Sequence, residues 1–347
     1  MYITHCARWR LLLGIGLALL LVCSVHVGAA ATKPAGQMTH AIHFTIAPTF
    51  YEPAETAGIT SFLFLYALHD ALVKSMPGNP QAPSLAESWS ETEDGLTYEF
   101  KLRQGVTFHN GDPLTAEDVK FSLERYRGTG AVLFKEKLKA VEIVDPHLVR
   151  IHLKEPWPDF MTYLGTPATS LGWIVPKKYL ERVGDDGFKK HPIGAGPYKF
   201  VSQREGIELV LEAYEGYWRK TPHVKTLIMR SIPEDSTRLA MLKTGEADIA
   251  YAMMGSTAEE VKRDPKLKLA YSEGQGIFFI YFNEQGDPKS SWHDLRVRQA
   301  LNYAIDRQAL SEQQTLQQFP LMPRQSYVTM GANSSLSVST LRLCLVR

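Results

Sequence analysis

The segment YEFKLRQGVTFHNGDPLTAEDVKFSLERY, residues 98–126, carries the pattern that decides the fold of this chain. Apolar and polar residues alternate over 98–103, which predicts a half-buried strand. The Asn-Gly dipeptide at 110–111 predicts a tight turn with its glycine at positive φ. Thr115 stands where a helix N-cap belongs, and Asp118 can complete a capping box with it. The segment therefore predicts a strand, a turn and a capped helix, in that order.

This segment resembles the signature region of the family 5 extracellular solute-binding proteins, the peptide- and nickel-binding receptors of ABC importers. The family pattern runs LR-x-GV-x-FH-[ND]-G-x-P-[LF]-TA-x-DV, and residues 102–119 match it at fixed spacing. His109 and Asp112 in this stretch also invite interpretation as metal ligands. No second pair of ligands lies nearby at metal-binding spacing, so we interpret them as a turn-flanking histidine and a solvated aspartate, and predict no metal site.

Three further segments resemble the same family: LAESW at 85–89, PIGAGPY at 192–198 and RVRQALNYAIDR at 296–307. The glycine pair in the second segment also suggests a dinucleotide-binding loop. That interpretation fails, because Pro197 and a strand-like stretch follow where a helix N-terminus would have to accept phosphate. Near Ser311 the resemblance stops, whereas relatives continue well beyond this point.

The resemblance implies an α/β fold with the two-lobe architecture of the type II periplasmic-binding proteins. It also implies an inserted subdomain, and a second lobe that is mostly missing from this chain. The chain is longer than a single hydrophobic core usually supports, which agrees with more than one lobe. We expect a signal peptide over 1–31 and a discontinuous lobe I over 32–60 and 192–280, interrupted by an inserted subdomain over 61–191. The start of lobe II is expected over 281–310, and an aberrant or disordered tail over 311–347.

Local patterns predict the individual elements outside the signature. Alternation over 38–46 predicts the first strand, and the apolar run 59–72 predicts a buried helix. The Asp-Pro dipeptide at 145–146 separates two alternating runs and predicts a hairpin. Asp294 is expected to be the N-cap of a helix, and the apolar face of this helix, which includes Val297, is expected to lie in the core.

The N-terminus predicts export. Arg8 and Arg10 precede a nearly uncharged apolar run over 11–27, and three small alanines at 29–31 offer a cleavage site. Cys23 follows a valine that is too large for the usual lipoprotein signal. We predict a cleaved signal peptide and a periplasmic protein, with an uncleaved membrane anchor as the alternative.

Composition argues against a protein that binds nucleic acid and against one stabilised by internal disulfides. The chain has 38 Lys and Arg against 37 Asp and Glu, and loss of Arg8 and Arg10 with the signal would leave a net charge of −1. No basic excess is present to bind nucleic acid. Of the three cysteines, Cys6, Cys23 and Cys344, only the last would remain after cleavage, so no internal disulfide is expected. We expect no cofactor.

Five residues are predicted to contact substrate. Phe50 and Tyr51 lie in the loop after the first strand, which lines the cleft in relatives; the alternative is that they pack against the adjoining helix. Trp173 is a further cleft candidate, with a core position as the alternative. Tyr281 and Asn283 end the continuously apolar strand GIFFIYFN, which suits the centre of a sheet covered on both faces. Relatives use this strand as a crossover toward the second lobe.

Two functions of different class remain. The first is the substrate-binding component of an ABC importer, which closes around a solute and presents it to permease subunits in the inner membrane. Oligopeptides or dipeptides are the default solute, ahead of nickel chelates, glutathione or sugars, and we expect binding to be impaired by truncation. The second is an exported hydrolase of peptides or glycans. The sequence contains no G-x-S-x-G, H-E-x-x-H or S-x-x-K motif, so no catalytic residue is predicted.

Overall fold

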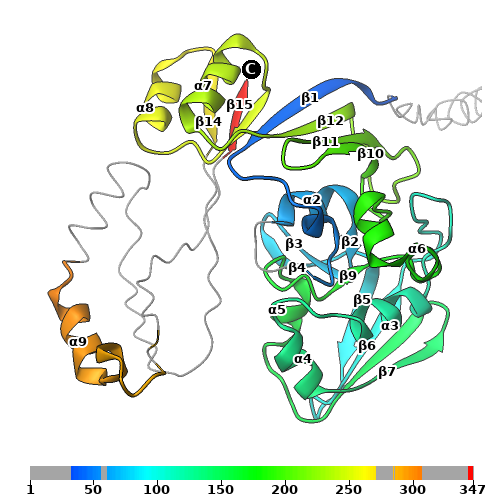
Figure 1. Cartoon of the computed structure of the whole chain (residues 1–347). Coiled ribbons are helices and arrows are strands. Elements are labelled where there is room, and N and C mark those ends of the chain that lie inside the picture. Colours follow the sequence, from blue (N-terminus) through cyan, green and yellow to red (C-terminus); the bar gives the residue numbers. More distant parts are fainter. Residues whose placement is uncertain (1–32, 56–60, 271–283, 285, 307–342, 347) are drawn as a thin grey trace, which may run out of the picture. The chain divides into compact units, whose positions relative to one another are not determined.

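The computed structural model describes residues 33–55, 61–270, 284, 286–306 and the backbone of 343–346 (Figure 1). Met1–Lys33 and Pro34–Arg347 are separate units, and the description below concerns the second. Within the described residues, no helix has the length and apolar character needed to cross a membrane. The predicted strand GIFFIYFN lies outside the described residues.

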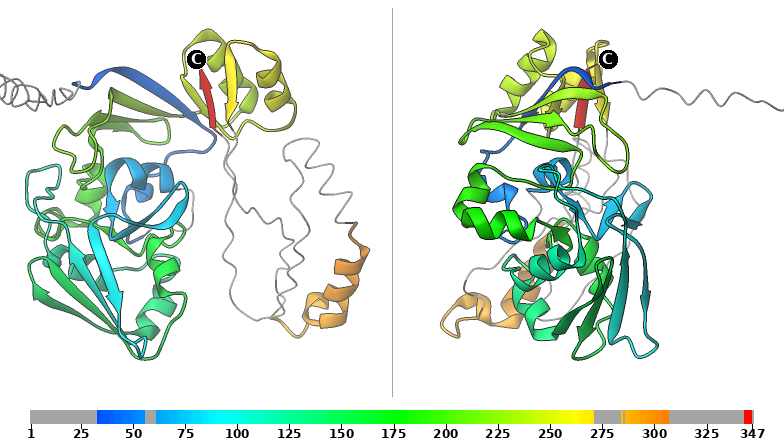
Figure 2. Two further views of the ribbon diagram at one scale, coloured as in Figure 1. Left: turned by 180° about the vertical axis from the view of Figure 1, so that it is seen from behind. Right: turned by 90° about the vertical axis from the view of Figure 1, so that its right-hand side faces the viewer.

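The larger sheet has seven strands and is mixed (Figures 1 and 2). Its strands β1, β12 and β13 are parallel, and the remaining neighbours are antiparallel. In order across the sheet, they are β10 (Tyr198–Arg204), β11 (Glu208–Ala213), β12 (Val224–Ser231), β1 (Ala35–Ile42), β13 (Ile249–Tyr251), β15 (Leu343–Val346) and β14 (Leu267–Ala270).

Strand β1 lies inside this sheet, and its last four residues, 39–42, are all buried. Ile42 belongs to an apolar cluster with Leu211 of β11, whereas Ala41 belongs to a second cluster with Leu242. The two faces of the strand therefore contact different cores, which explains why the alternation expected from the sequence becomes a continuous buried run. The strand spans Ala35–Ile42 and ends four residues earlier than predicted.

Helices α7 (Asp235–Thr244) and α8 (Gly255–Arg263) supply the second of these clusters. Helix α7 ends at Gly245, whose φ of 78° provides the left-handed C-cap that glycine adopts at low cost. Its buried apolar side chains pack with Ala250 of β13.

The second sheet contains the signature segment and is wholly antiparallel. Its order is β5 (Ala86–Glu91), β6 (Thr97–Leu102), β8 (Leu148–Leu153) and β7 (Leu138–Asp145). The predicted hairpin at 145–146 is confirmed, since β7 and β8 pair on either side of it. Helices α3 (Ala116–Glu124), α4 (Ala131–Lys137) and α5 (Phe160–Gly165) contribute to the same core.

The local predictions for the signature segment are confirmed. Gly111 has a φ of 87°, as the turn requires. The Thr115 backbone N–H donates to the Asp118 carboxylate at 2.9 Å, and both halves of the capping box are present at the start of α3. The strand, turn and helix follow one another in the predicted order.

Short elements connect the two sheets along the chain. They are η1 (Pro48–Tyr51), α2 (Phe62–Leu68), β2 (Asp70–Ala71), β3 (Val73–Met76), β4 (Asn79–Pro83), β9 (Trp173–Ile174) and α6 (Lys177–Lys190). Strand β2 pairs with β9, and β3 pairs with β4.

The helix predicted over 59–72 is wrong at its C-terminal end. Helix α2 ends at Leu68, and His69 is extended. The reason is a distant segment: a Cβ on Gly196 would lie 2.5 Å from the His69 backbone nitrogen, so the glycine backbone packs directly on the end of α2. Gly196 also donates its N–H to the Leu68 carbonyl at 3.0 Å, which satisfies one of the free carbonyls of the helix terminus.

The helix predicted from Asp294 forms as α9 (Leu295–Ala304), and the Asp294 side chain accepts from the Arg296 N–H at 2.8 Å. Its apolar face was predicted to lie in the core, and this is wrong among the described residues. No residue of α9 is buried, and Val297 is 38% exposed.

Candidate ligand-binding site

The candidate site lies where the parallel strands β1, β12 and β13 end. In open α/β sheets, ligands bind outside the carboxyl ends of the parallel strands. The register pairs Ile42 with Ser231, so β1 and β12 end side by side, and β13 pairs with β1 through His40 and Ala41, directly before this end. The loops that follow these strands therefore emerge at one edge.

Arg238 of α7 fixes two of these loops. Its side chain is 2% exposed, and its guanidinium donates to the carbonyls of Ile232 and Pro233, both at 2.7 Å, and of Ala252 at 3.1 Å. Ala252 has a φ of 56°, a left-handed conformation that costs energy for any residue with a Cβ. The bond from Arg238 helps to hold this strained loop, so the edge is a preformed surface.

A continuous set of rings crosses this edge, and we call His43, Tyr251, Phe62, Tyr66 and Trp173 the aromatic row. The His43 ring lies 5.1 Å from that of Tyr251, which lies 6.3 Å from Phe62. Phe62 and Tyr66, four residues apart on α2, are 6.4 Å apart, and Tyr66 lies 5.1 Å from Trp173. His43 is exposed, Phe62 and Tyr66 are half-buried, and the other two are buried.

His43 is the most exposed member of the aromatic row. Burial lowers the pKa of its imidazole, and the positive charge of Arg238 lowers it further. The imidazole is therefore neutral near pH 7 and can both donate and accept a hydrogen bond.

A buried ion pair supports the other end of the row. The Lys74 ammonium lies 4.5 Å from the centroid of Tyr66 and 5.2 Å from that of Trp173, so it contacts both rings as a cation over a π face. Its Nζ is 2.7 Å from an Asp70 carboxylate oxygen, and both side chains are almost fully buried. Burial lowers the pKa of Lys74, while Asp70 opposes that shift. Burial, followed by the nearby carboxylate, raises the pKa of Tyr66 to about 12.

Asp70 is the centre of this support. Besides Lys74, its carboxylate accepts from the Ser84 hydroxyl at 3.2 Å, from the Tyr217 hydroxyl at 2.9 Å and from the Trp218 indole N–H at 2.9 Å. A buried carboxylate with four donors is satisfied and its position is fixed. Because the last two donors follow β11, the sheet and the aromatic row are tied to the same group.

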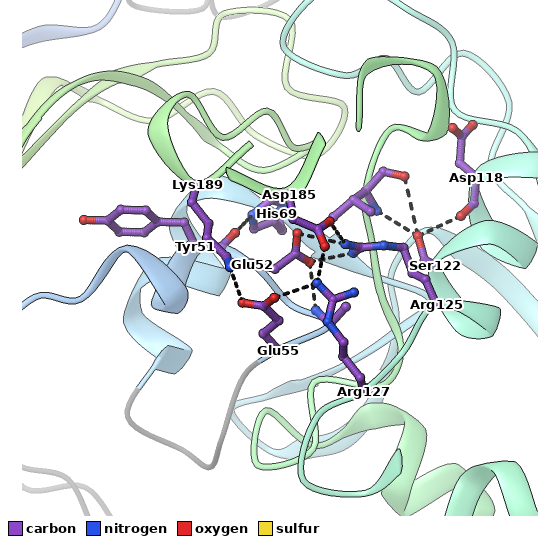
Figure 3. Close-up of polar contacts among 12 residues, drawn as sticks. Tyr51, Glu52, Glu55, His69, Asp118, Ser122, Arg125, Arg127, Asp185 and Lys189 are labelled. Atoms are coloured by element: carbon purple, nitrogen blue, oxygen red, sulfur yellow. Dashed lines mark hydrogen bonds and ion pairs between the residues drawn. The ribbon is translucent and has the colours of Figure 1, made fainter. Parts of the chain in front are cut away.

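The segment directly after η1 is held by a second charged cluster (Figure 3). Arg125, at the end of α3, donates to Glu52 at 2.7 Å and to Asp185 of α6 at 2.7 Å. Arg127 also bonds Asp185, and it bonds Glu55 at 2.6 Å. Glu52 is fully buried, so its ion pair is shielded from solvent and the loop after η1 is firmly attached to α3 and α6.

The structure places the predicted site residues in different surroundings. Phe50 is half-buried and stacks on Phe64 of α2, with ring centroids 5.7 Å apart. Tyr51 is 1% exposed and packs edge-on against the same phenylalanine. Trp173 is 2% exposed and belongs to the aromatic row. Tyr281 and Asn283 lie outside the described residues, and the contact of all five with substrate stays a prediction.

Sequence reasoning missed four members of the aromatic row: His43, Phe62, Tyr66 and Tyr251. The spacing of Phe62 and Tyr66 places them on one helical face, and that signal was available in the sequence. The other two meet only because β1 and β13 lie side by side, which no local pattern contains.

The histidine of the signature motif has a structural role. The His109 Nδ1 accepts from the Gly194 N–H at 3.2 Å, so Nε2 carries the proton and donates to the Gly196 carbonyl at 3.0 Å. Both ring nitrogens are thus occupied in fixing the glycine loop. Among the described residues, no cluster of histidine, cysteine or acidic side chains could hold a metal ion.

Burial keeps three histidines neutral, namely His40, His69 and His109, which we call the three buried histidines. It lowers their pKa values to about 4, about 3 and about 4, respectively. The His69 Nε2 donates to the Tyr51 carbonyl at 2.9 Å, a bond that the neutral ring can make. Protonation of these rings would place charge inside the protein core, so all three rings are neutral near pH 7.

Comparison with solved structures confirms the fold class. NikZ from Campylobacter jejuni, in complex with Ni(L-His), superimposes with a TM-score of 0.66 at 29% identity, over 80% of this chain and 54% of that one. DppA from Helicobacter pylori, in complex with the peptide STSA, gives a TM-score of 0.68 at 25% identity, over 80% and 58%. The chain has the α/β fold of the type II periplasmic-binding proteins.

The family model for bacterial extracellular solute-binding proteins, family 5 Middle, matches residues 81–318, and the chain belongs to this family. Heme-binding protein A of Haemophilus influenzae is 32% identical over 293 residues, covering 77% of this chain and 52% of that protein. The glutathione-binding protein GsiB of Salmonella typhimurium is 35% identical over 232 residues, covering 65% and 44%. The chain therefore spans about half the length of these relatives.

Proposed function

We propose that this chain provides the solute-contacting surface of a periplasmic receptor for an ABC importer, and that its solutes are small peptides or peptide-like molecules. Family membership supports the receptor class. Similarity to proteins described as binding a peptide and glutathione supports the solute class. In this proposal the protein is exported with a cleaved signal peptide and delivers solute to permease subunits in the inner membrane.

The aromatic row is the observation that carries the proposal. Half-buried rings such as Phe62 and Tyr66 offer apolar faces for peptide side chains, and the rings beneath them hold those faces in place. His43 adds a neutral hydrogen-bonding group at the edge. The neutral imidazole can donate a hydrogen bond to a ligand carbonyl or carboxylate and accept one from a ligand N–H. Apolar faces beside such a hydrogen-bonding group match the chemistry of a short peptide.

Ligand-observed NMR on the full chain tests this proposal for a tripeptide and glutathione, because the method detects weak binding. Ni(II)-histidine and hemin are paramagnetic, so their binding is followed by the intrinsic tryptophan fluorescence of the protein. Each ligand is titrated separately against the wild type, Phe62→Ala and His43→Ala. Val132→Ala is the matched control, since Val132 is 83% exposed and lies outside the aromatic row. We expect saturable tripeptide binding that Phe62→Ala weakens about fivefold, as the loss of one aromatic contact of about 1 kcal/mol predicts.

Two results would contradict the proposal. Equal tripeptide affinity in the wild type, Phe62→Ala and His43→Ala would exclude the aromatic row as the contact surface. Saturable binding of hemin or Ni(II)-histidine without tripeptide binding would keep the receptor class and overturn the solute class.

A further inference from the structure

Strand β15 joins two strands of the larger sheet that do not pair with each other. It lies between β13 and β14 and pairs with both, so that Ala250 and Leu269 oppose Cys344 from its two sides. Figure 1 shows β15 beside β14. Strands β13 and β14 do not pair with each other. The two strands therefore form the walls of a slot one strand wide, which we call the β13–β14 slot.

Contacts outside β15 hold both walls of this slot. Strand β13 pairs with β1 through Ile249 and Ala250. Leu267 of β14 is buried with Val261 of α8 in the same apolar cluster as Ala250. The walls are thus anchored independently of the strand between them, and without it each would present a row of free backbone donors and acceptors.

The strand reaches this slot through a long stretch of chain. The covalent tether between β14 and this strand is residues 271–342. The entropic cost of joining two points of a chain rises with their separation, so the advantage of a chain's own strand over the equivalent strand of a neighbouring molecule is smaller here than in a local hairpin.

We propose that the β13–β14 slot accepts the Leu343–Val346 strand of a second copy of this chain, giving a dimer by reciprocal strand exchange. The strand, LCLV, carries no charge and no proline, so nothing in it opposes pairing with another molecule. The closed and exchanged forms have the same backbone pairing, and only the tether distinguishes them. Protein concentration therefore controls the exchange. This inference is independent of the proposed solute.

The register supplies a direct test by disulfide cross-linking. Opposed residues in antiparallel strands have Cα atoms about 4.5–5.5 Å apart, which is within disulfide range. The chain with Leu269→Cys and Cys344→Ser is mixed with the wild type and oxidised gently, and peptide mapping identifies the bond. We expect a covalent heterodimer joined between position 269 of one chain and position 344 of the other, with a yield that rises with concentration.

The control is Lys268→Cys with Cys344→Ser, because position 268 opposes Leu345 and its side chain leaves the opposite face of the sheet. We expect at least about a fivefold lower yield from this variant. Equal yields would indicate random collision and overturn the proposal. Leu269→Cys alone, with Cys344 retained, should form the bond within one chain. If it does so while no heterodimer appears at the highest soluble concentration, exchange is excluded.

A second measurement needs no introduced cysteine. Analytical ultracentrifugation of the wild type under reducing conditions should show a dimer fraction that rises with concentration. Leu345→Pro removes a backbone N–H from the strand and should abolish that fraction. A wild type that stays monomeric throughout, or a dimer that survives Leu345→Pro, would overturn the proposal.

Discussion

Replacement of Asp70 by alanine should be among the most destabilising single changes in this protein. The Asp70 and Lys74 side chains are 0% and 5% exposed, and their charged atoms are 2.7 Å apart. Asp70→Ala leaves the ammonium buried without a counter-ion and leaves the donors Tyr217 and Trp218 unpaired. Breaking a buried ion pair on one side costs about 3–5 kcal/mol.

Urea unfolding followed by circular dichroism measures this cost. With a slope of about 3 kcal/mol per molar urea, a loss of about 4 kcal/mol lowers the midpoint by roughly 1.3 M. Lys74→Met combined with Asp70→Ala should recover about half of the loss, because the uncompensated cation is gone. Lys74→Met alone leaves Asp70 its three neutral donors and should cost less than Asp70→Ala.

The pH dependence provides a diagnostic for this mechanism. Burial already lowers the pKa of Lys74, so the unfolded chain binds more protons at this site than the folded one. Stability then rises with pH, and removal of Asp70 strengthens that trend. The deficit of Asp70→Ala should therefore shrink as the pH rises from 7 towards 10. A midpoint shift below about 0.3 M with an unchanged slope, or a deficit that is constant with pH, would refute the reasoning.

The other predictions concern packing, protonation and export. Gly196→Ala should prevent folding or lower the free energy of unfolding by more than about 3 kcal/mol, because its Cβ would lie 2.5 Å from backbone atoms. The control is Gly165→Ala, whose Cβ would have its nearest neighbour at 3.4 Å, and urea unfolding should show it to be nearly neutral. Burial lowers the pKa of the three buried histidines to about 3 or 4, so the free energy of unfolding should fall as the pH drops from 6.5 to 4, by about 2 kcal/mol per histidine at pH 5. His109→Gln should remove about a third of this pH dependence, and an unchanged dependence would contradict the prediction. Gly111→Val should cost about 1–2 kcal/mol through left-handed strain alone, and an unchanged urea midpoint would refute this. Intact mass of protein from a Gram-negative periplasm should show cleavage close after Ala31, and a full-length mass in the membrane pellet would exclude it.

The signature segment shows what local patterns predict well. The turn at Gly111 and the capping box between Thr115 and Asp118 depend on neighbours within a few residues, and both are present as predicted. The end of α2 depends on Gly196, more than a hundred residues away, and no periodicity in the apolar run over 59–72 indicates it. The sequence therefore predicts features whose causes lie within a few residues, and does not predict a helix end that a distant segment determines.

The candidate site shows the same division. Phe50 was predicted from the family resemblance and Trp173 from its own segment, and the structure brings Trp173 into the aromatic row. The contact between His43 and Tyr251 depends on β1 lying beside β13, a pairing across more than two hundred residues. A surface assembled from strand ends follows from the order of strands in the sheet, which alternation within one strand does not specify.

The donors of Asp70 bear on whether the segment 61–191, expected to be an insert, can be moved between proteins. Tyr217 and Trp218 lie after β11, outside the 61–191 boundaries expected for the insert, yet they complete the hydrogen bonding of a carboxylate within it. A chimera that transplants residues 61–191 alone would separate the two halves of that contact. Exchange of this segment among homologous receptors therefore requires the Tyr-Trp pair at 217–218 to be inherited with it, so the functional unit for recombination is discontinuous in the gene.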